Sequence, residues 1–304
     1  AGKSLFHENG KQEISAKTIK KYLVGLQAWN LYHNITFPTA SERRIDMFII
    51  KASARVDASL PPRQQKPPIL LTHALYLYSK LANGSEKQRA VMDLAIVAFW
   101  GMARIGELTH KTATGEAAAN SVLSSDVILK KTPIGRKALL MVAGAKTARP
   151  GELQFIVLNS QVGELCPVKA VLRRLDACIH IDSSLFGCDT PDGRRHLTRR
   201  TFMEVVQETL KMGGFDGLLG HSFRVGGASL RAALGFAHKE IRSLGQWRLD
   251  CYKLYLRSYL EQELDDAKAI LMAKEQLSVG NRLNGSYYIR RITLRLRLAN
   301  AVVV

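Results

Sequence analysis

Four short blocks of the sequence contain residue types that could act together on a phosphodiester. Arg104 lies in GMARIGELTH, Lys146 in GAKTARPG, and His221 and Arg224 are three residues apart in GHSFRVGGASLRAALG. Trp247 precedes a run of tyrosines in LGQWRLDCYKLYLRSYL. Arginine forks stabilise negative charge on phosphoryl oxygens, a tyrosine hydroxyl can attack phosphorus, and a general acid can protonate the leaving oxygen. Together these residue types predict metal-independent cleavage of a phosphodiester.

Each block also has a simpler structural explanation when it is taken alone. Arg104 and Glu107 are three residues apart. Taken alone, this spacing is more typical of an exposed ion pair on a helix than of a guanidinium held in place for catalysis. His221 could cap its own helix, and Lys146, at a predicted turn, could simply be solvated. The order and the spacing of the blocks therefore carry the prediction.

Three tyrosines compete for the role of nucleophile. Tyr252, Tyr255 and Tyr259 occupy positions i, i+3 and i+7. The apolar spacing predicts a helix over 250–274, on which these three side chains would share one face. A buried stripe of core residues would explain at least two of them equally well.

The elements that must position these residues are mainly helices. Apolar residues recur at helical spacing in nine segments, and three short runs rich in Val, Ile and Leu are separated by turn-forming residues. The helices are predicted over 15–32 (with Ser15 as N-cap), from about 41 to 49, and over 72–82, 86–100, 167–179, 198–212, 222–234, 238–244 and 250–274; the strands are predicted over 122–130, 137–143 and 152–158. The predicted fold class is mainly α with a small three-stranded antiparallel sheet.

A proline-rich stretch divides the chain. PPRQQKPP at 61–68 has four prolines among polar and basic residues, so it can neither form a helix nor bury a core, and it predicts a linker. We expect a small helical unit over 1–60, a larger unit of helices and the sheet over 69–274, and a tail over 275–304; the family resemblance described below implies that the first is a DNA-binding domain and the second a catalytic domain. In that tail RRITLRLRL alternates basic and apolar residues, which is typical of a strand, either at the edge of its own domain or against DNA or a neighbouring subunit.

The composition favours a polyanionic partner. The chain has 304 residues and a formal net charge of +18, from 44 Lys and Arg against 26 Asp and Glu. Nucleic acid is the commonest partner of so basic a folded protein, although a basic protein that binds none has the same composition.

Other classes find no support in the sequence. The four cysteines form no CxxC pair and no His lies at metal-ligand spacing, so we expect free thiols, no metal and no cofactor. No apolar run reaches the length of a membrane span. The polar first residues contain no secretory segment, which predicts an intracellular protein.

The blocks, in this order, resemble the catalytic domain of the tyrosine recombinase (phage integrase-like) family. The pattern of that family is Arg, Lys, His-x-x-Arg, His or Trp, and then Tyr. The resemblance covers most of the chain, because SAKTIKKYLVGLQAW looks like the helical core-binding domain and CPVKAVLRRL like the helix that follows the sheet. HSFRVGGAS and GQWRLDCYKLYLR are similar to recombinases of eukaryotic mobile elements such as Cryptons and DIRS-like elements.

The resemblance implies a role for each residue that binds the phosphate or moves a proton. Arg104 and Arg224 would clamp the scissile phosphate, and Glu107 would support Arg104. Lys146 would protonate the leaving 5′ oxygen. His221 would handle the proton of the nucleophile.

The resemblance also favours one tyrosine. Tyr255 would attack and form a 3′-phosphotyrosine bond, while Trp247 would stand where many relatives have His. The family usually has one residue more between these two positions than this chain has, so a one-residue deletion in the turn is implied. Tyr252 and Tyr259 remain alternatives as nucleophile.

The implied function is site-specific DNA recombination for integration, excision or transposition, by a tetramer on two DNA sites. The protein would be nuclear if it comes from a eukaryotic mobile element, and otherwise cytoplasmic or nucleoid-bound. We expect double-stranded DNA as partner, and no small-molecule substrate. The alternatives are a type IB topoisomerase, which shares the active-site logic, and a DNA-binding protein that keeps the fold without catalysis. The residues expected to contact DNA are Lys17, Lys20, Lys21, Arg194, Arg195, Arg199 and Arg200.

Overall fold

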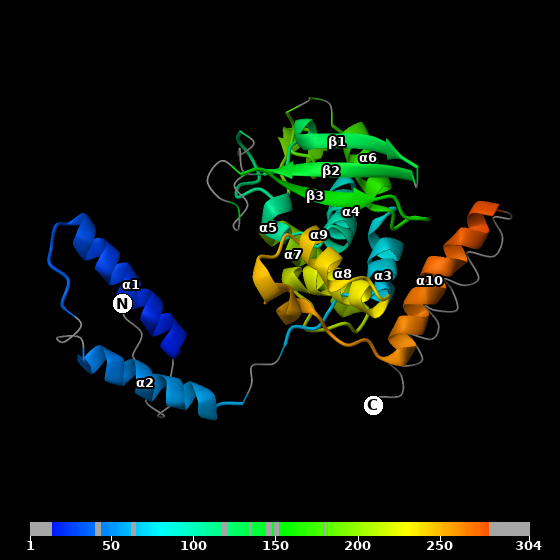
Figure 1. Cartoon of the computed structure of the whole chain (residues 1–304). Helices are drawn as coiled ribbons and strands as arrows, with labels where there is room; N and C mark the ends of the chain where they lie inside the picture. Colours follow the sequence, from blue (N-terminus) through cyan, green and yellow to red (C-terminus); the bar gives the residue numbers. More distant parts are fainter. Residues whose placement is uncertain are drawn as a thin grey trace. The chain divides into compact units, whose positions relative to one another are not determined.

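The computed structural model divides the chain into two compact units, Ala1–Gln65 and Lys66–Val304. The division falls within the segment 61–68 that the sequence predicts as a linker. Figure 1 shows the two units. The structure describes residues 14–39, 44–61, 65–116, 121–133, 135–143, 148, 152–178, 180 and 182–279.

The first unit contains two described helices, α1 (Ala16–Tyr32) and α2 (Arg44–Ser59). Ser15 caps α1 as predicted, because its side chain accepts a hydrogen bond from the backbone N–H of Thr18. The backbone N–H of Ala16 also donates to the Asp57 carboxylate at 2.8 Å, which ties the start of α1 to α2.

The second unit combines a small sheet with a helical layer (Figure 1). The sheet is antiparallel in the order β1 (Val127–Thr132), β2 (Gly135–Val142) and β3 (Gln154–Asn159). Alternate residues of the central strand β2 are buried against the helices. The predicted mainly α fold with a three-stranded antiparallel sheet is confirmed.

The helical layer surrounds one central helix. Its elements are α3 (Leu71–Leu81), α4 (Glu86–Trp100), α5 (Ile105–Leu108), α6 (Pro167–Asp176), α7 (Arg199–Met212), α8 (Gly220–Ala233), α9 (His238–Leu244), the 3₁₀ segment η2 (Leu249–Tyr255) and α10 (Glu261–Val279). Every residue of α4 from Ala90 to Trp100 is buried. This helix packs against α3, α6, α7 and α8, so it forms the core on which the site is built.

The strands differ from the prediction in two respects. The first strand begins at Val127 and not at 122, because the preceding Ser124–Asp126 forms a 3₁₀ turn closed by the Asp126 carboxylate on the Leu123 N–H. A second, two-stranded sheet of β4 (Cys188–Thr190) and β5 (Gly193–Arg195) was not predicted. The turn residues PDG between these strands are the signal that could have found it.

The single helix predicted over 250–274 is wrong. The chain forms η2, has no regular secondary structure from Leu256 to Leu260, and begins α10 at Glu261. The carbonyl of Tyr255 accepts from the Ser229 hydroxyl, so tertiary hydrogen bonding replaces helical continuation at this point. The three tyrosines therefore do not share one helical face. Helix α10 also extends past residue 275, where a tail was predicted, and the strand predicted within 290–298 lies outside the described residues.

Helix α8 is pressed between two main-chain segments. A Cβ at Gly226 would overlap the carbonyl of Ile69, and one at Gly227 would overlap the carbonyl of Phe99. The chain that enters the second unit and the end of α4 therefore both approach α8 closely. This packing fixes α8, which carries two of the predicted site residues.

Candidate active site

Arg104 is held at the start of a short helix after α4. The Glu107 carboxylate accepts from the Arg104 backbone N–H at 2.9 Å and from its Nη1 at 2.5 Å. The two side chains are 23% and 11% exposed. Glu107 therefore fixes both the main chain and the guanidinium of Arg104, and the pair is less exposed than an ordinary surface ion pair.

Arg224 is a buried cation without a carboxylate partner among the described residues. Its Nη1 donates to the carbonyl of Met102, and its Nη2 donates to the carbonyl of Gly245 at 2.6 Å. Its Nε has no partner within the described part of the chain. Burial, together with the nearby positive charge of Arg104, lowers the pKa of Arg224 to about 10. An uncompensated cation of this kind favours the binding of an anion.

Tyr255 lies against three of the other predicted residues. Its ring centroid is 4.8 Å from that of His221 and 5.0 Å from that of Trp247. The guanidinium carbon of Arg224 lies 5.5 Å from the Tyr255 ring and 4.3 Å from the Trp247 ring. The end of η2 thus brings the tyrosine to the face of α8 that carries His221 and Arg224.

Trp247 packs into a space that only a glycine leaves open. A Cβ at Gly245 would overlap the six-membered ring of Trp247. The indole is buried, and its N–H has no acceptor within the described residues. A donor without a partner beside Arg224 is suited to a phosphate oxygen.

His221 is held in its neutral form. Burial lowers its pKa, and the positive charges of Arg224, Lys66, Arg104 and Arg257 lower the pKa further. The imidazole is therefore neutral at physiological pH, and one ring nitrogen can accept a proton from a neighbouring hydroxyl.

The two alternative tyrosines point elsewhere. Tyr252 is buried, and its hydroxyl lies 3.2 Å from Nδ1 of His238. Tyr259 packs against the main core, where burial and the charge of Glu263 raise its pKa. Of the three tyrosines, only Tyr255 contacts Arg224. The remaining predicted residue, Lys146, lies outside the described residues.

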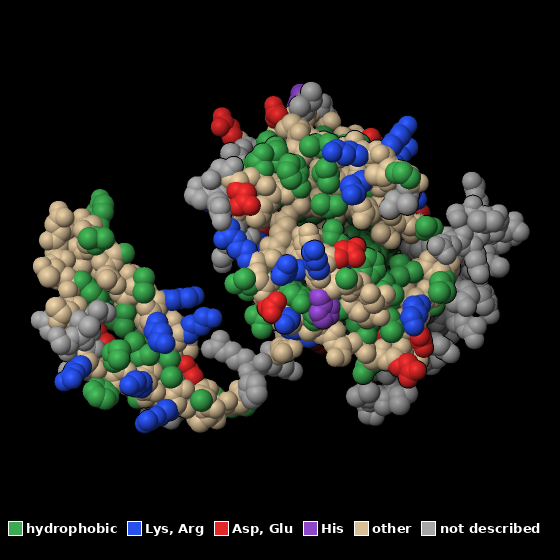
Figure 2. Space-filling view, viewed as in Figure 1, with side chains coloured by type: hydrophobic (Ala, Val, Ile, Leu, Met, Phe, Trp, Pro, Cys, Tyr) green, Lys and Arg blue, Asp and Glu red, His purple; other side chains and the backbone are tan. Residues whose placement is uncertain are grey.

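The predicted DNA contacts differ in their surroundings. Lys17, Lys20, Lys21, Arg195, Arg199 and Arg200 are exposed. At the surface, Arg195 pairs with Asp192 and Arg200 with Glu204. Figure 2 shows Lys and Arg side chains on the visible face of both units. Exposed ion pairs contribute little to stability, so Arg195 and Arg200 can exchange these partners for others at little cost.

Arg194 departs from that group. Its guanidinium donates to the carbonyls of Ala177, Ser184 and Gly187, and it pairs with Asp189 at 3.0 Å. Because its donors are used inside the unit, Arg194 has a structural role and, unlike the other predicted DNA contacts, is not exposed. The sequence alone did not distinguish it from its neighbour Arg195.

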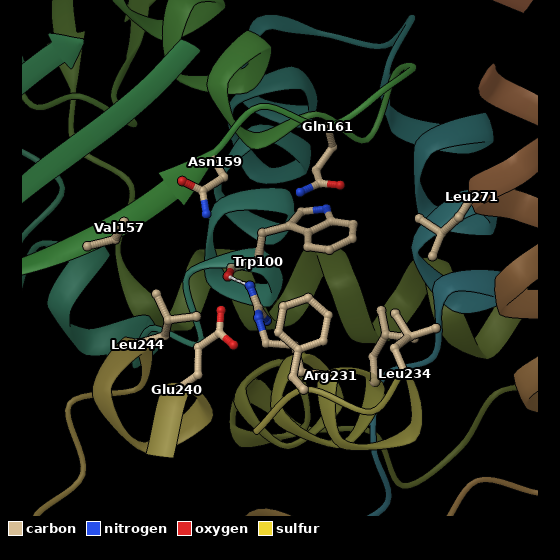
Figure 3. A pocket seen from close by; sticks show the side chains of 11 residues that line it. Trp100, Val157, Asn159, Gln161, Arg231, Leu234, Glu240, Leu244 and Leu271 are labelled. Carbon is tan, nitrogen blue, oxygen red and sulfur yellow. Dashed lines mark hydrogen bonds between the residues drawn. The ribbon is translucent and has the colours of Figure 1, made fainter. Parts of the chain in front are cut away.

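Figure 3 shows a cavity that none of the predicted site residues lines. It holds about 120 Å³ and is lined by β3, α8, α9, α10 and the end of α4. Arg231, beside the cavity, donates Nη2 to the carbonyl of Trp100 at 2.5 Å and Nη1 to that of Gly227 at 2.9 Å. It thereby ties α8 to α4, and burial lowers its pKa to about 10.

Two kinds of site are not found in the described part of the chain. No group of three or more His, Cys, Asp and Glu side chains is arranged to hold a metal ion there. Within the same residues, no helix combines the length and the apolar character that crossing a membrane requires.

Comparison with known proteins shows a likeness in fold. No family model matches the chain, and no curated protein matches it. The XerA recombinase is 14% identical, with 85% of this chain and 83% of that chain covered and a TM-score of 0.42. A lambda integrase dimer bound to a COC′ core site is 15% identical, with 82% of each chain covered and a TM-score of 0.46. The Tn1549 transposon integrase in complex with transposon right end DNA is 13% identical, with 88% and 89% covered and a TM-score of 0.43.

Proposed function

We propose that this chain is a tyrosine recombinase that cleaves and rejoins DNA through a covalent bond to Tyr255. The observation that carries the proposal is the contact of Tyr255 with His221, Trp247 and the buried guanidinium of Arg224. A tyrosine beside a neutral histidine and an uncompensated cation has the components that transfer of a phosphoryl group requires.

The scissile phosphate would bind between Arg104 and Arg224. No carboxylate lies within ion-pair distance of Arg224 among the described residues, whereas Glu107 occupies only part of the Arg104 fork. Two opposite unit charges about 4 Å apart interact by about 4 kcal/mol at an effective dielectric constant of about 20. A phosphate would therefore offset the cost of burying the arginine, and the same donors would stabilise the additional charge of the transition state.

The covalent step exchanges one phosphodiester for another. The hydroxyl oxygen of Tyr255 forms a bond to phosphorus, and the bond from phosphorus to the 5′ oxygen breaks. His221 takes the proton of the tyrosine, and the 5′ oxygen leaves with the bonding electrons and receives a proton, for which Lys146 is the proposed donor. Rejoining reverses these steps when a 5′ hydroxyl attacks the phosphotyrosine, so no net hydrolysis occurs and no ATP is needed.

The basic surface would bind duplex DNA through its phosphates. The net charge of +18 and the exposed lysines of α1 support this part of the proposal. Assembly would be a tetramer on two DNA sites, and the reaction would serve integration, excision or transposition. The protein would be nuclear if it comes from a eukaryotic mobile element, and otherwise cytoplasmic or nucleoid-bound.

A suicide-substrate assay tests the chemistry. The protein is incubated with nicked duplexes that carry candidate element ends, and covalent adducts are resolved on a denaturing gel. We expect an adduct with the unaltered chain and with Tyr252→Phe, and none with Tyr255→Phe. Salt-sensitive binding without any adduct would refute catalysis, and site-independent relaxation of supercoils would favour a topoisomerase.

A further inference from the structure

We propose that Arg257 is a positioning residue that holds Tyr255 in place for attack. It would do so by binding the main chain on both sides of the nucleophile and the segment through which the chain enters the second unit. This inference rests on the proposed function, because it concerns how the same tyrosine is presented to a phosphate.

The guanidinium of Arg257 spans two segments that are far apart in the sequence. Its Nη1 donates to the carbonyls of Leu254 at 2.9 Å and Leu256 at 2.8 Å, the two residues that flank Tyr255. Its Nε donates to the carbonyl of Lys66 at 3.3 Å. One planar fork therefore joins the nucleophile segment to the first residues of the second unit.

The main chain of Arg257 adds a second tie. Its backbone N–H donates to the hydroxyl of Ser229 at 2.9 Å, and that hydroxyl lies 3.2 Å from the carbonyl of Tyr255. Ser229 is fully buried on α8, the helix that carries His221 and Arg224. The backbone of the nucleophile is thus tied directly to the helix that supplies its neighbours.

The segment that Arg257 binds is itself fixed to α8. The backbone N–H of Ile69 donates to the carbonyl of Ser222 at 2.9 Å, and Gly226 allows the close approach of Ile69. Between η2 and α10, the residues from Arg257 to Tyr259 belong to neither a helix nor a strand. Their position therefore depends on contacts such as those of Arg257 and Ser229.

Arg257 has a competing interpretation as a phosphate contact. Its positive charge is close enough to lower the pKa of His221, so it could act on the DNA by charge alone. Lysine separates the two roles, because Arg257→Lys keeps the charge but loses the planar fork that reaches several carbonyls. A positioning role predicts that Arg257→Lys cleaves slowly, and a charge role predicts that it cleaves at the unaltered rate.

The experiment compares binding with single-turnover cleavage on the nicked duplex. The variants are Arg257→Ala, Arg257→Lys and Ser229→Ala. The control is Lys253→Ala, which removes a charge from the same segment. The Lys253 side chain is exposed and pairs with Asp250. We expect both Arg257 variants and Ser229→Ala to slow cleavage by on the order of 10- to 100-fold, since small misplacements of a reacting group have effects of this size. DNA affinity should change less than about threefold, and Lys253→Ala should cleave at the unaltered rate.

Several results would overturn the positioning role. They are an unaltered rate in Arg257→Ala, full recovery in Arg257→Lys, or a loss of affinity that matches the loss of rate. A substrate with a bridging 5′ sulfur, whose leaving group needs no protonation, supplies a further test. Recovery of Arg257→Ala on that substrate would place Arg257 at the leaving group instead. An unaltered chain that forms no adduct at all would refute the proposed function itself, which is a different result from an adduct that Arg257→Ala leaves unaffected.

Discussion

Substitution of Gly245 by alanine should damage the site through Trp247. The backbone of Gly245 has φ −84° and ψ 0°, which alanine adopts without strain, so the effect comes from the added methyl group. That methyl would overlap the Trp247 ring, and the ring must move away from the guanidinium of Arg224. Overpacking costs about 1–3 kcal/mol and a lost cation–π contact about 0.5–2 kcal/mol. We expect the free energy of unfolding to fall by about 2–3 kcal/mol, as the sum of two such terms at the lower part of their ranges.

Cleavage should fall as well, because Trp247 also packs against Tyr255. Denaturant unfolding and single-turnover cleavage of a nicked duplex measure the two effects. Gly106→Ala is the matched control for stability, since a Cβ there meets nothing within 4 Å and alanine favours helix α5 by about 1 kcal/mol.

A double-mutant cycle decides whether the clash is the cause. In a Trp247→Ala background the ring is absent, so Gly245→Ala should cost almost nothing further and the two substitutions should couple by about 2–3 kcal/mol, which is the whole cost of Gly245→Ala in the unaltered chain. Equal costs of Gly245→Ala in both backgrounds would refute this reasoning.

Two further predictions concern a buried histidine and the support of Arg104. Burial, and secondarily the charge of His196, lowers the pKa of His110 to about 4, so protonation favours the unfolded chain. Its contribution is complete above pH 6.5 and is lost as the pH falls from 6.5 toward 4, by up to about 3 kcal/mol. His110→Phe should flatten the dependence of the unfolding free energy on pH over this range, and an unchanged dependence would contradict the assignment. Glu107→Gln keeps one acceptor but weakens the hold on Arg104, so single-turnover cleavage should fall by on the order of tenfold with little change in DNA affinity. A loss confined to affinity would instead make Glu107 a general determinant of binding.

The helices and the sheet could be predicted from the sequence because local signals and burial agree there. Ser85 and Gln88 form a capping box at the start of α4, and the apolar residues that follow are all buried. The same reasoning failed over 250–274, where the apolar spacing also suits a helix. There the side chains of Ser229 and Arg257 bind the main chain and keep it out of a helix. Ser229 is distant in the sequence, and no pattern marks Arg257. Tertiary hydrogen bonds of this kind leave no periodic signal.

The residue types of the site were also accessible from the sequence, but their supporting contacts were not. Glu107 could be paired with Arg104 because it lies three positions further along the chain, which is about one helical turn. The acceptors for Arg224 are main-chain carbonyls, which every residue carries, so no residue type marks them in advance. Arg194 and Arg195 show that the sequence also cannot separate a structural arginine from an exposed one. Arg194 binds a carbonyl inside the unit, whereas Arg195 pairs with Asp192 at the surface.

The carbonyls that Arg224 binds suggest why a buried cation stands at this position. Met102 lies two residues before Arg104, and Gly245 lies two residues before Trp247. One guanidinium on α8 therefore holds both of the segments that carry Arg104 and Trp247, the other residues proposed to bind the phosphate. Burial makes the cation costly, and under the proposed function the scissile phosphate would offset that cost while meeting donors that are already aligned. The same interactions that assemble the site would thus leave it with a charge suited to that phosphate.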